Sequence, residues 1–537
     1  MDADYVVVGA GSAGCVVASR LSEDGARVVL LEAGPRDWHP LIHIPAGVLH
    51  LLHHPHINWN YNSEGETGTA GRQIYWPRGK VMGGSSSING MLYVRGNPAD
   101  YDGWAQMGCR GWSYDEVLPL FRKSETYVQG GDPEYRSKGG PLMVEDYRTV
   151  LPLTDAFVQA AQQAGFPFTA DYNGKSQEGV AYSQMTRRGR VRGSTARTFL
   201  AQAKGRANLK VETGAIATGL MFDGRRCVGV RFRQNGTERE VRAAREVILS
   251  GGAVNSPHLL QISGIGPAQH LHAIGVPVVH DLPGVGGNLS DHYVVRLTHR
   301  VKDAVTINQL SRGLRLAREA VRYATIGNGA LTFGITAAMV FGRSREGLSS
   351  PDLQLLFTPA SYAQGRFREL EREPGMTVAV CPVRPESRGT IMAQSPDPLQ
   401  YPAIRPNYLS APNDLRVLIA GVGHTRRIFA QPALAAHSVE ETLPGPQVQS
   451  DDAFLDFARQ TGTTIFHPVG TCKMGTDATA VVDPRLKVHG IEGLRVIDAS
   501  VMPTVTTGNT NAPTIMIGEK GAQMIKEDAR AAVAAAA

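Results

Sequence analysis

The chain has 537 residues, 42% of them apolar and 19% charged, which is enough for about two or three domains' worth of buried core and unlike a disordered chain. A formal charge of +6 without any long basic run argues against nucleic acid as a partner. No apolar stretch reaches the roughly 18 residues that span a bilayer, so we expect at most a peripheral membrane contact.

Five scattered cysteines contain no C-x-x-C pair, so the sequence predicts neither a metal site nor a disulfide framework. The first residues run directly into an apolar strand pattern, without the basic and apolar regions of a signal peptide. These features favour a reducing, cytoplasmic location, with peripheral contact at the inner membrane as the only departure from it.

The N-terminal segment has the pattern of a strand, a helix and a second strand. Apolar runs at residues 5–8 and 28–31 flank a helical pattern over residues 12–22. The turn between strand and helix reads Gly9-Ala10-Gly11-Ser12-Ala13-Gly14, the G-x-G-x-x-G fingerprint of a dinucleotide-binding unit. This fingerprint fits NAD and FAD equally well, because both present an ADP moiety to the same turn.

Each residue of this unit has an expected role. Gly9 allows the tight turn, Gly11 lets the backbone approach a pyrophosphate, and Gly14 lets the helix pack on the strand. Glu32, at the end of the second strand, is placed to bind a ribose hydroxyl. The predicted cofactor contacts of this unit are Gly9, Gly11, Ser12, Ala13, Gly14, Glu32 and Ala33.

A second glycine cluster occupies residues 79–90 and is too long and too polar in its middle for a hairpin turn. Its many backbone amides can wrap a flat polar ring or a phosphate. A flexible linker is the alternative, but the apolar flanks and Asn89 favour an ordered, buried loop that contacts the cofactor.

A third cluster follows a strand predicted over residues 246–250. Gly251 and Gly252 form a turn into a helix, for which Ser256 is the expected N-cap and Pro257 the first helical residue. This pattern indicates a second strand-to-helix turn in the same sheet.

The glycine clusters thin out between residues 298 and 463, where a helix is predicted over residues 310–324 and a strand over residues 377–380. The glycine-rich style returns at residues 467–475 and in an apolar strand at 494–498. We therefore predict an α/β protein in which a second domain is inserted into a Rossmann-like first domain. The first domain comprises residues 1–150, 195–297 and 465–537, and the inserted α+β domain, mostly antiparallel sheet plus helices, comprises residues 151–194 and 298–464.

Two loops near the C-terminus carry candidate reactive side chains. His467 lies in a Pro/Gly-flanked loop after Ile465 and Phe466, a setting that often presents reactive groups, although most histidines are simply packed or exposed. Thr510 and Asn511 precede the C-terminal helix, and a structural role as its N-caps is as plausible as a reactive role. The sequence alone leaves both alternatives open.

The motifs taken together resemble the glucose-methanol-choline (GMC) family of FAD-dependent oxidoreductases over essentially the whole chain. Residues 79–96 resemble the first family signature, with Met82 as a minor departure, and residues 252–266 fit the second. Further similarity to the bacterial alcohol, choline and L-sorbose dehydrogenase branch comes from residues 40–45, 171–179, 194–197, 282–286, 387–389 and 467–475. The resemblance implies that the Rossmann-like domain binds FAD and that the inserted domain binds the substrate.

The resemblance also assigns roles to individual positions. The family's catalytic pair falls on His467 and Asn511, and its adenine-contacting valine on Val211. Some members carry a histidine that bonds covalently to the flavin, but the matching residue here is Ile88, so we expect non-covalent FAD. The other implied cofactor contacts are Gly83, Gly84, Ser85, Asn89, Gly90, Met91, Leu92, Asp498 and Ala499.

An acidic residue of the choline specialists appears here as Ala337, which disfavours a quaternary-ammonium substrate. We expect oxidation of a neutral primary alcohol, whether aliphatic, aromatic or a polyol, to the aldehyde. His467 would take the hydroxyl proton while hydride passes to the flavin, and Asn511 would bind the same oxygen. Electrons would then pass to a quinone or another carrier.

Four alternatives stay open on the sequence. The first two are an oxygen-using alcohol oxidase of the same fold and a flavin-dependent lyase. An NAD-linked dehydrogenase is opposed by the second and third glycine clusters. A catalytically silent binding protein is opposed by the filled positions His467 and Asn511.

Overall fold

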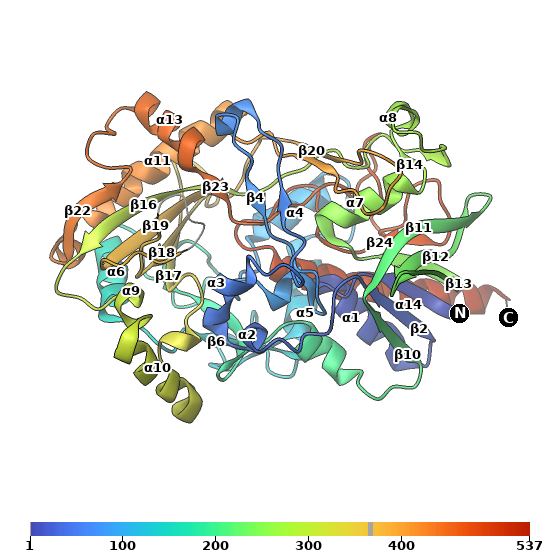
Figure 1. The fold of residues 1–537 in the computed structure, drawn as a ribbon, viewed down its shortest axis with the longest axis horizontal. Helices are drawn as coiled ribbons and strands as arrows, with labels where there is room; N and C mark the ends of the chain where they lie inside the picture. The colour runs from blue at the N-terminus through green and yellow to red at the C-terminus, as the bar shows by residue number, and fades with distance from the viewer. Residues whose placement is uncertain (1, 364–368, 537) are drawn as a thin grey trace.

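The computed structural model describes residues 2–363 and 369–536. Two main β-sheets lie towards opposite ends of an elongated molecule, with helices and long loops between them (Figure 1). The predicted α/β class, with a Rossmann-like part and a mostly antiparallel second sheet, is confirmed.

The first sheet has seven strands, of which β10, β2, β1, β13 and β24 run parallel while β11, β12 and β13 form an antiparallel meander. β2 is wholly buried and β1 nearly so, as is typical of parallel strands covered on both faces. The strands are β1 (Asp2–Val8), β2 (Val28–Glu32), β10 (Leu209–Thr213), β11 (Ala215–Asp223), β12 (Arg226–Gln234), β13 (Thr237–Leu249) and β24 (Leu494–Val496).

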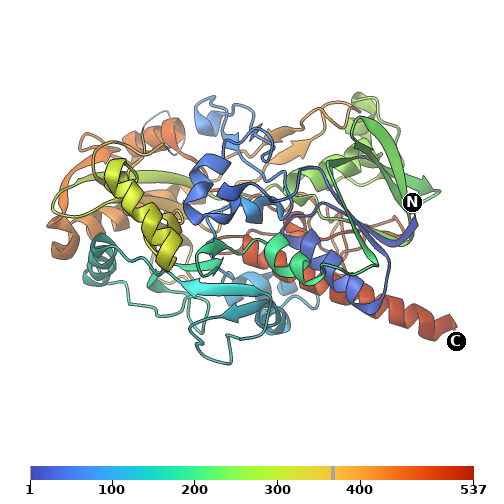
Figure 2. The same cartoon turned by 60° about the horizontal axis from the view of Figure 1, so that its bottom comes forward.

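Helix α1 (Ser12–Leu21) follows β1, and the C-terminal helix α14 (Asn511–Ala536) packs along it (Figure 2). A buried ion pair joins the two helices, because both carboxylate oxygens of Glu519 in α14 accept hydrogen bonds from the guanidinium of Arg20, at 2.7 and 2.9 Å. The last strand of the chain and its last helix therefore complete the domain that the first residues begin.

The second sheet is antiparallel throughout, in the order β22, β16, β19, β18, β17, β7, with β23 paired to β16. Side chains of β16 alternate between its two faces. Val295 and Leu297 pack into the core formed with α6 and α11, whereas Val294 and Arg296 point to the opposite face. The strands are β7 (Gly179–Tyr182), β16 (Tyr293–Val301), β17 (Ala338–Gly342), β18 (Leu353–Thr358), β19 (Gly375–Pro382), β22 (Ser438–Leu443) and β23 (Thr463–Thr464).

Smaller elements connect the two sheets. A four-stranded sheet contains β5 (Glu125–Tyr127), β6 (Leu142–Asp146), β8 (Gln184–Arg188) and β9 (Val191–Arg192), and short pairs are formed by β3 (Tyr61–Asn62) with β4 (Tyr75–Trp76), β14 (Ile265–Gly266) with β15 (His280–Asp281), and β20 (Thr390–Met392) with β21 (Ala403–Arg405). The remaining helices are α2 (Pro40–His43), α3 (Val48–Leu51), α4 (Pro98–Gln106), α5 (Tyr114–Ser124), α6 (Pro152–Gln163), α7 (Gly252–Ile262), α8 (Ala268–Ala273), α9 (Ile307–Leu310), α10 (Gly313–Ile326), α11 (Pro412–Phe429), α12 (Pro432–Ala435) and α13 (Asp451–Thr461).

The start of α7 differs from the prediction. The helix begins at Gly252, so Pro257 lies inside it and Ser256 is not its N-cap. Proline in a helix interior leaves the carbonyl four residues earlier without its usual donor. Here the hydroxyl of Thr471 donates to that carbonyl, of Ala253, at 2.7 Å, which explains why the helix continues through the proline.

The predicted domain limits cut across two elements. β16 straddles the limit between residues 297 and 298, and the four-stranded sheet combines strands from both predicted domains. The division of the chain into two domains stays a prediction. The five cysteines are free and buried. In the part of the chain that the structure describes, no helix is long and apolar enough to cross a membrane.

Candidate active site

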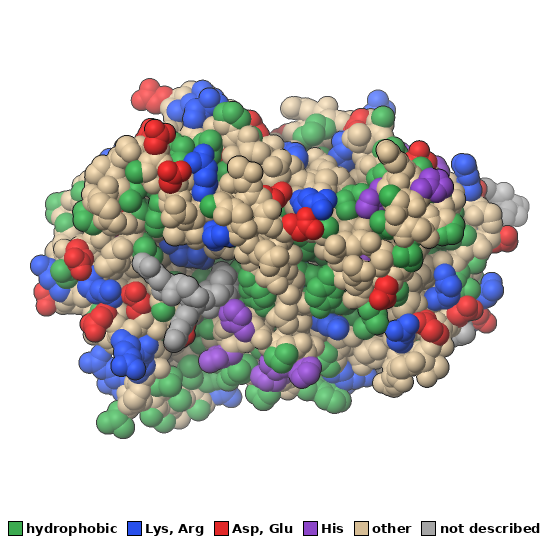
Figure 3. All heavy atoms as spheres, turned by 45° about the horizontal axis from the view of Figure 1, so that its top comes forward, with side chains coloured by type: hydrophobic (Ala, Val, Ile, Leu, Met, Phe, Trp, Pro, Cys, Tyr) green, Lys and Arg blue, Asp and Glu red, His purple; other side chains and the backbone are tan. Residues whose placement is uncertain are grey.

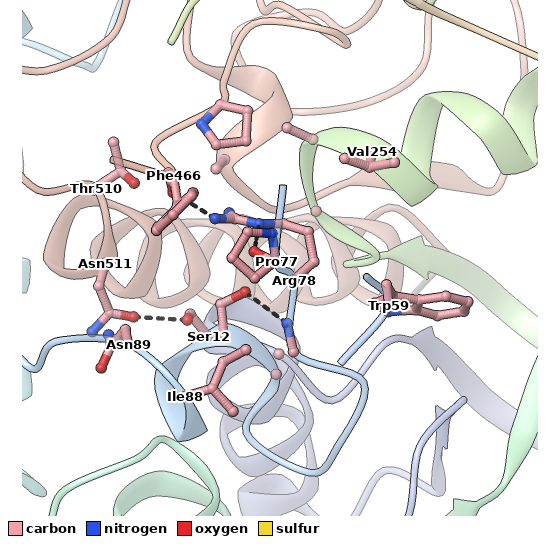
Figure 4. A pocket seen from close by; sticks show the side chains of 18 of the residues that line it. Ser12, Trp59, Pro77, Arg78, Ile88, Asn89, Val254, Phe466, Thr510 and Asn511 are labelled. Carbon is pink, nitrogen blue, oxygen red and sulfur yellow. Dashed lines mark hydrogen bonds between the residues drawn. The ribbon is translucent and has the colours of Figure 1, made fainter. Parts of the chain in front are cut away.

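A cavity of about 310 Å³ lies between the two sheets (Figure 4). Its walls come from the turn between β1 and α1, the end of β2, the loop after β4, the start of α7, the inner face of the second sheet and the two C-terminal loops. Segments that are hundreds of residues apart in the sequence therefore meet around one space.

The turn after β1 has the geometry that its glycines predict. Gly9 has a φ of +101°, which a side chain would strain, and a Cβ on Gly14 would lie 1.9 Å from the carbonyl oxygen of Gly9. Gly11, Ser12 and Ala13 line the cavity, and no side chain caps the amino end of α1. The free N–H groups at this helix terminus suit a phosphate.

Glu32 lines the cavity at the end of β2 and is 5% exposed. Its two carboxylate oxygens accept hydrogen bonds from the backbone N–H groups of Ala10 and Gly34, both at 2.9 Å. Burial raises the pKa of this carboxyl to about 7, against the effect of those two hydrogen bonds. Each oxygen retains acceptor capacity for a ribose hydroxyl, as the sequence predicts.

The second glycine cluster is an ordered part of the cavity wall. The N–H of Gly83 donates to the carbonyl of Ala10 at 2.7 Å, and a Cβ on Gly84 would lie 2.7 Å from the Cα of Gly11. Arg192 fixes the far end by donating to the backbone and side-chain oxygens of Asn89, at 2.6 and 2.8 Å. These bonds exclude the flexible-linker alternative. Gly84, Ser85, Ile88, Asn89, Gly90, Met91 and Leu92 line the cavity.

Asp498 and Ala499 line the cavity beside the third glycine cluster. One oxygen of Asp498 accepts hydrogen bonds from the N–H of Gly252 at 2.9 Å and from the hydroxyl of Ser256 at 2.6 Å. The expected N-cap Ser256 thus serves to hold Asp498, and burial raises the pKa of this carboxyl.

Val211, to which the family resemblance assigns the adenine contact, lies beside the cavity wall and not in it. This residue pairs with Leu30 in the middle of β10 and does not line the cavity. The chain turns at Gly214, whose N–H donates to the carbonyl of Gly34 at 2.9 Å. That turn brings residues 215–217 to the end of β2, where the ligand crevice of a parallel sheet lies. Three other predicted residues support this wall without lining it: Gly9, Gly14 and Gly83.

His467 lies at the cavity wall, 7% exposed, and forms a hydrogen-bonded pair with His292. The Nδ1 atoms of the two rings are 2.9 Å apart, and Nε2 of His292 is 3.2 Å from the carbonyl oxygen of Val383. A carbonyl only accepts, so Nε2 of His292 carries its hydrogen and Nδ1 of the same ring accepts from Nδ1–H of His467. This series of hydrogen bonds requires the tautomer in which Nε2 of His467 is unprotonated.

The free Nε2 of His467 accepts a hydrogen bond from the side-chain amide of Asn509 at 3.0 Å. Burial, and then the neighbouring His292 and Arg78, hold the pKa of His467 well below its usual 6.5. Burial also lowers the pKa of His292, to about 4. Both rings are therefore neutral near pH 7, and Nε2 of His467 is a base at the cavity surface.

Asn511, the second member of the predicted catalytic pair, lines the same cavity as His467. It is the first residue of α14 and lines the cavity, where its side-chain oxygen accepts a hydrogen bond from the hydroxyl of Ser12 at 2.8 Å (Figure 4). In this structure Asn509 is the asparagine that contacts His467. Both asparagines line the same cavity, and neither side chain is recorded as bonding to the first turn of α14.

The loop that carries His467 is held from both sides. The backbone N–H of His467 donates to the carboxylate of Asp291 at 2.8 Å, and the preceding residue Phe466 has a φ of +71°. Arg78 donates to the carbonyl of Phe466 at 2.7 Å (Figure 4). The sequence analysis missed Asn509, His292, Asp291 and Arg78; the only local signal was a second asparagine within the loop of residues 506–513.

Comparison with known proteins places the chain in a family. Residues 3–294 and 385–518 match the two domains described as GMC oxidoreductase. The chain is 43% identical to an alcohol dehydrogenase [acceptor] of Pseudomonas putida over 529 residues, with 97% of this chain and 95% of that protein covered. It is 44% identical to the mitochondrial choline dehydrogenase of Homo sapiens over 536 residues, covering 97% and 89%.

Solved structures agree with this assignment. Pyridoxine 4-oxidase from Mesorbium loti superposes with a TM-score of 0.90 at 31% identity, covering 98% of this chain and 99% of that one. A formate oxidase variant from Aspergillus oryzae superposes with a TM-score of 0.92 at 28% identity, covering 98% of both chains. The chain belongs to the GMC oxidoreductase family and is an FAD-binding oxidoreductase that acts on CH–OH donors.

Proposed function

We propose that this protein is an alcohol dehydrogenase that oxidises a neutral primary alcohol to the aldehyde and passes the electrons to a quinone or another carrier. The observation that carries the proposal is the hydrogen-bond chain that leaves Nε2 of His467 unprotonated at the cavity wall. An alcohol can release hydride only as its hydroxyl proton leaves, so the site needs a base of this kind.

The cavity fits a non-covalent FAD. The uncapped amino end of α1 provides N–H donors for the pyrophosphate, and Glu32 provides acceptors for ribose hydroxyls. The loop ending at Leu92 provides the wall for the flavin ring, and Ile88 offers no atom for a covalent bond to it. When bound, FAD supplies the acceptor for the hydride.

His467 and Asn509 would share the work on the alcohol oxygen. The alcohol hydroxyl replaces the amide of Asn509 as the donor to Nε2 of His467 and gives its proton to that nitrogen. The amide N–H of Asn509 is then free to donate to the alcohol oxygen as negative charge develops there. Nδ1–H of His467 stays bonded to His292, which holds the ring in place as it becomes charged.

Charged groups on the substrate side of the cavity favour a neutral alcohol over a quaternary ammonium. Among the described residues that line the cavity, the carboxylates are Glu32 and Asp498, both at the nucleotide end. The inner face of the second sheet contributes Arg296 instead, for which the described residues show no hydrogen bond or ion pair. A cationic substrate beside this guanidinium would be repelled.

An aromatic cage is the other means of binding a quaternary ammonium. Trp59, Tyr61 and Tyr401 contact one another at the cavity wall, with ring centroids 4.6 to 6.3 Å apart. The ammonium of Lys80 lies 4.6 Å from the ring centroid of Trp59, and the hydroxyl of Tyr61 donates to Asn255 at the start of α7. This cluster already holds a cation, the ammonium of Lys80.

The proposal is tested by the visible spectrum of the purified protein, recorded without oxygen before and after adding a panel of primary alcohols. Bleaching of the flavin that persists when air is admitted supports a dehydrogenase. Rapid recovery in air would identify an oxidase, the activity in the names of the two solved neighbours. A yellow protein that no alcohol bleaches would contradict alcohol oxidation and favour a lyase.

The exclusion of cationic substrates has its own test. Arg296→Glu reverses the charge at the inner face of the second sheet, so the ratio of flavin reduction rates with choline and with a neutral alcohol of similar length should rise about tenfold or more. Arg300→Glu is the matched control, because Arg300 lies on the same strand but is paired with Glu371 away from the cavity. An unchanged ratio in the Arg296 variant would contradict the argument.

A further inference from the structure

Helix α10 lies on the surface beside the second sheet and is exposed along almost its whole length (Figure 2). Glu319 is its only buried residue. Leu314, Val321 and Ile326 are 90%, 61% and 68% exposed, which makes them three of the most exposed large apolar side chains among the described residues. In Figure 3, hydrophobic and basic side chains lie together at the lower left, where Figure 1 places α10.

The polarity of the two sides of α10 is the reverse of that in an ordinary surface helix, whose apolar side faces the protein. The side facing the protein is attached by polar contacts: Glu319 accepts from the N–H of Ala330 at 2.7 Å, and the hydroxyl of Tyr323 donates to the carbonyl of Arg190 at 2.9 Å. The side facing away carries an apolar stripe with helical spacing, formed by Leu314, Ala317, Val321 and Ala324, all of them exposed.

Arginines lie along one side of this stripe. Residues 311–326 contain four arginines and one acid, Glu319, which is itself paired with Arg322 at 3.0 Å. Arg315 and Arg318 are exposed, and no ion pair is recorded for either among the described residues. An exposed apolar stripe bordered by basic side chains is the pattern of a helix that lies in the interface of an anionic bilayer.

We propose that α10 is a membrane-surface helix, which docks the protein on an anionic phospholipid bilayer through the stripe of Leu314, Ala317, Val321 and Ala324. Charge selects this occupant over a second copy of the chain. A symmetric contact between two α10 helices would bring the same arginines together, whereas phosphate head groups neutralise them. The proposal does not depend on the proposed activity.

The position of α10 links the membrane to the cavity. The chain leaves α10 at Ile326, passes through the short helical turn Ala330–Thr332 and reaches Ile335 and Thr336, which line the cavity. Docking through α10 would therefore place this wall of the cavity towards the bilayer.

The test is co-sedimentation of the FAD-loaded protein with vesicles of phosphatidylcholine alone and of phosphatidylcholine with phosphatidylglycerol. We expect binding that depends on the anionic lipid and weakens with salt. Leu314→Gln with Val321→Gln should reduce the partition coefficient about tenfold or more, since both side chains lose their contact with the acyl region. Arg315→Gln with Arg318→Gln should reduce it by about an order of magnitude and weaken the salt dependence.

Val439→Gln is the matched control, because this valine in β22 is 56% exposed and lies outside α10, and it should bind as the wild type does. Three results would overturn the proposal: no binding of the wild type to anionic vesicles, equal binding by the wild type and both double variants, or a dimer in light scattering that only the Leu314→Gln, Val321→Gln variant loses. Alcohol-driven flavin reduction in detergent-free buffer reports separately on the proposed function.

Discussion

We predict that His292 is a positioning residue, which fixes the tautomer of His467 without contacting the alcohol. Replacing His292 by leucine preserves approximate side-chain bulk but removes the acceptor for Nδ1–H of His467. Replacing it by asparagine restores a side-chain oxygen close to the position of the lost Nδ1. Both variants lose the bond to Val383, so the difference between them isolates the acceptor.

The size of the effect follows from burial. His292 is 0% exposed, so its removal leaves the N–H of His467 unsatisfied in the interior. An unsatisfied buried donor costs about 1–3 kcal/mol. At about 1.4 kcal/mol per factor of ten, His292→Leu should slow the step that needs the base by about fivefold to 150-fold. His292→Asn should recover most of that loss.

The assay is stopped-flow reduction of the bound flavin by a saturating primary alcohol without oxygen, with FAD content measured from the visible spectrum of each variant. Both variants should keep their FAD, because His292 does not line the cavity. A leucine variant within twofold of the wild type would refute the positioning role. An asparagine variant as slow as the leucine variant would show that packing, not the acceptor, is what His292 provides.

Three further predictions concern pH, cofactor retention and stability. Because burial lowers the pKa of His467 below 6.5, the rate of flavin reduction should not fall between about pH 9 and about pH 6.5, and a fall near pH 7 would contradict the assignment. Below about pH 6.5 the unfolded chain binds a proton at this ring and the folded chain does not, so the free energy of unfolding should fall by up to about 1.4 kcal/mol per pH unit as the pH is lowered. Glu32→Gln replaces two acceptor oxygens by one amide oxygen and one NH2 group, which only donates, and should weaken FAD binding about tenfold or more in a fluorescence titration of the apoprotein; an unchanged Kd would contradict the ribose contact. Glu519→Ala removes the buried carboxylate that pairs with Arg20 and Lys123, while Arg20 keeps its second partner Glu23, so the free energy of unfolding should fall by about 1–3 kcal/mol in urea titration; an unchanged value would show that this ion pair does not help to hold α14.

The first βαβ unit could be predicted because everything that determines it is local. The apolar runs, the glycine spacing and Glu32 lie within about thirty residues, and the structure places them as expected. The helix α7 was predicted, but its start at Gly252 could not be, because the carbonyl of Ala253 that Pro257 leaves free is satisfied by Thr471, 218 positions further along the chain. The preference of proline for the first turn of a helix gives no access to that partner.

The contact between His467 and Asn509 could not be predicted for a related reason. Asn509 and Asn511 are two positions apart, and the sequence does not say which one turns to His467. That choice depends on where α14 begins and on the hydroxyl of Ser12, which binds Asn511. His292 could not be identified as a partner because it lies 175 residues from His467 in the sequence, and only the pairing of β16 with β23 brings the two residues together.

β16 separates two kinds of change that evolution can make in this enzyme. Its outer face is committed to the helical core, and the residue just before it, His292, is committed to the base. Arg296 lies on the opposite face, where it lines the cavity and takes part neither in the helical core nor in the contact with His467. Under the proposed function, an exchange of Arg296 would change the charge that meets the substrate, while the contacts of His292 and of the helical core stay as they are.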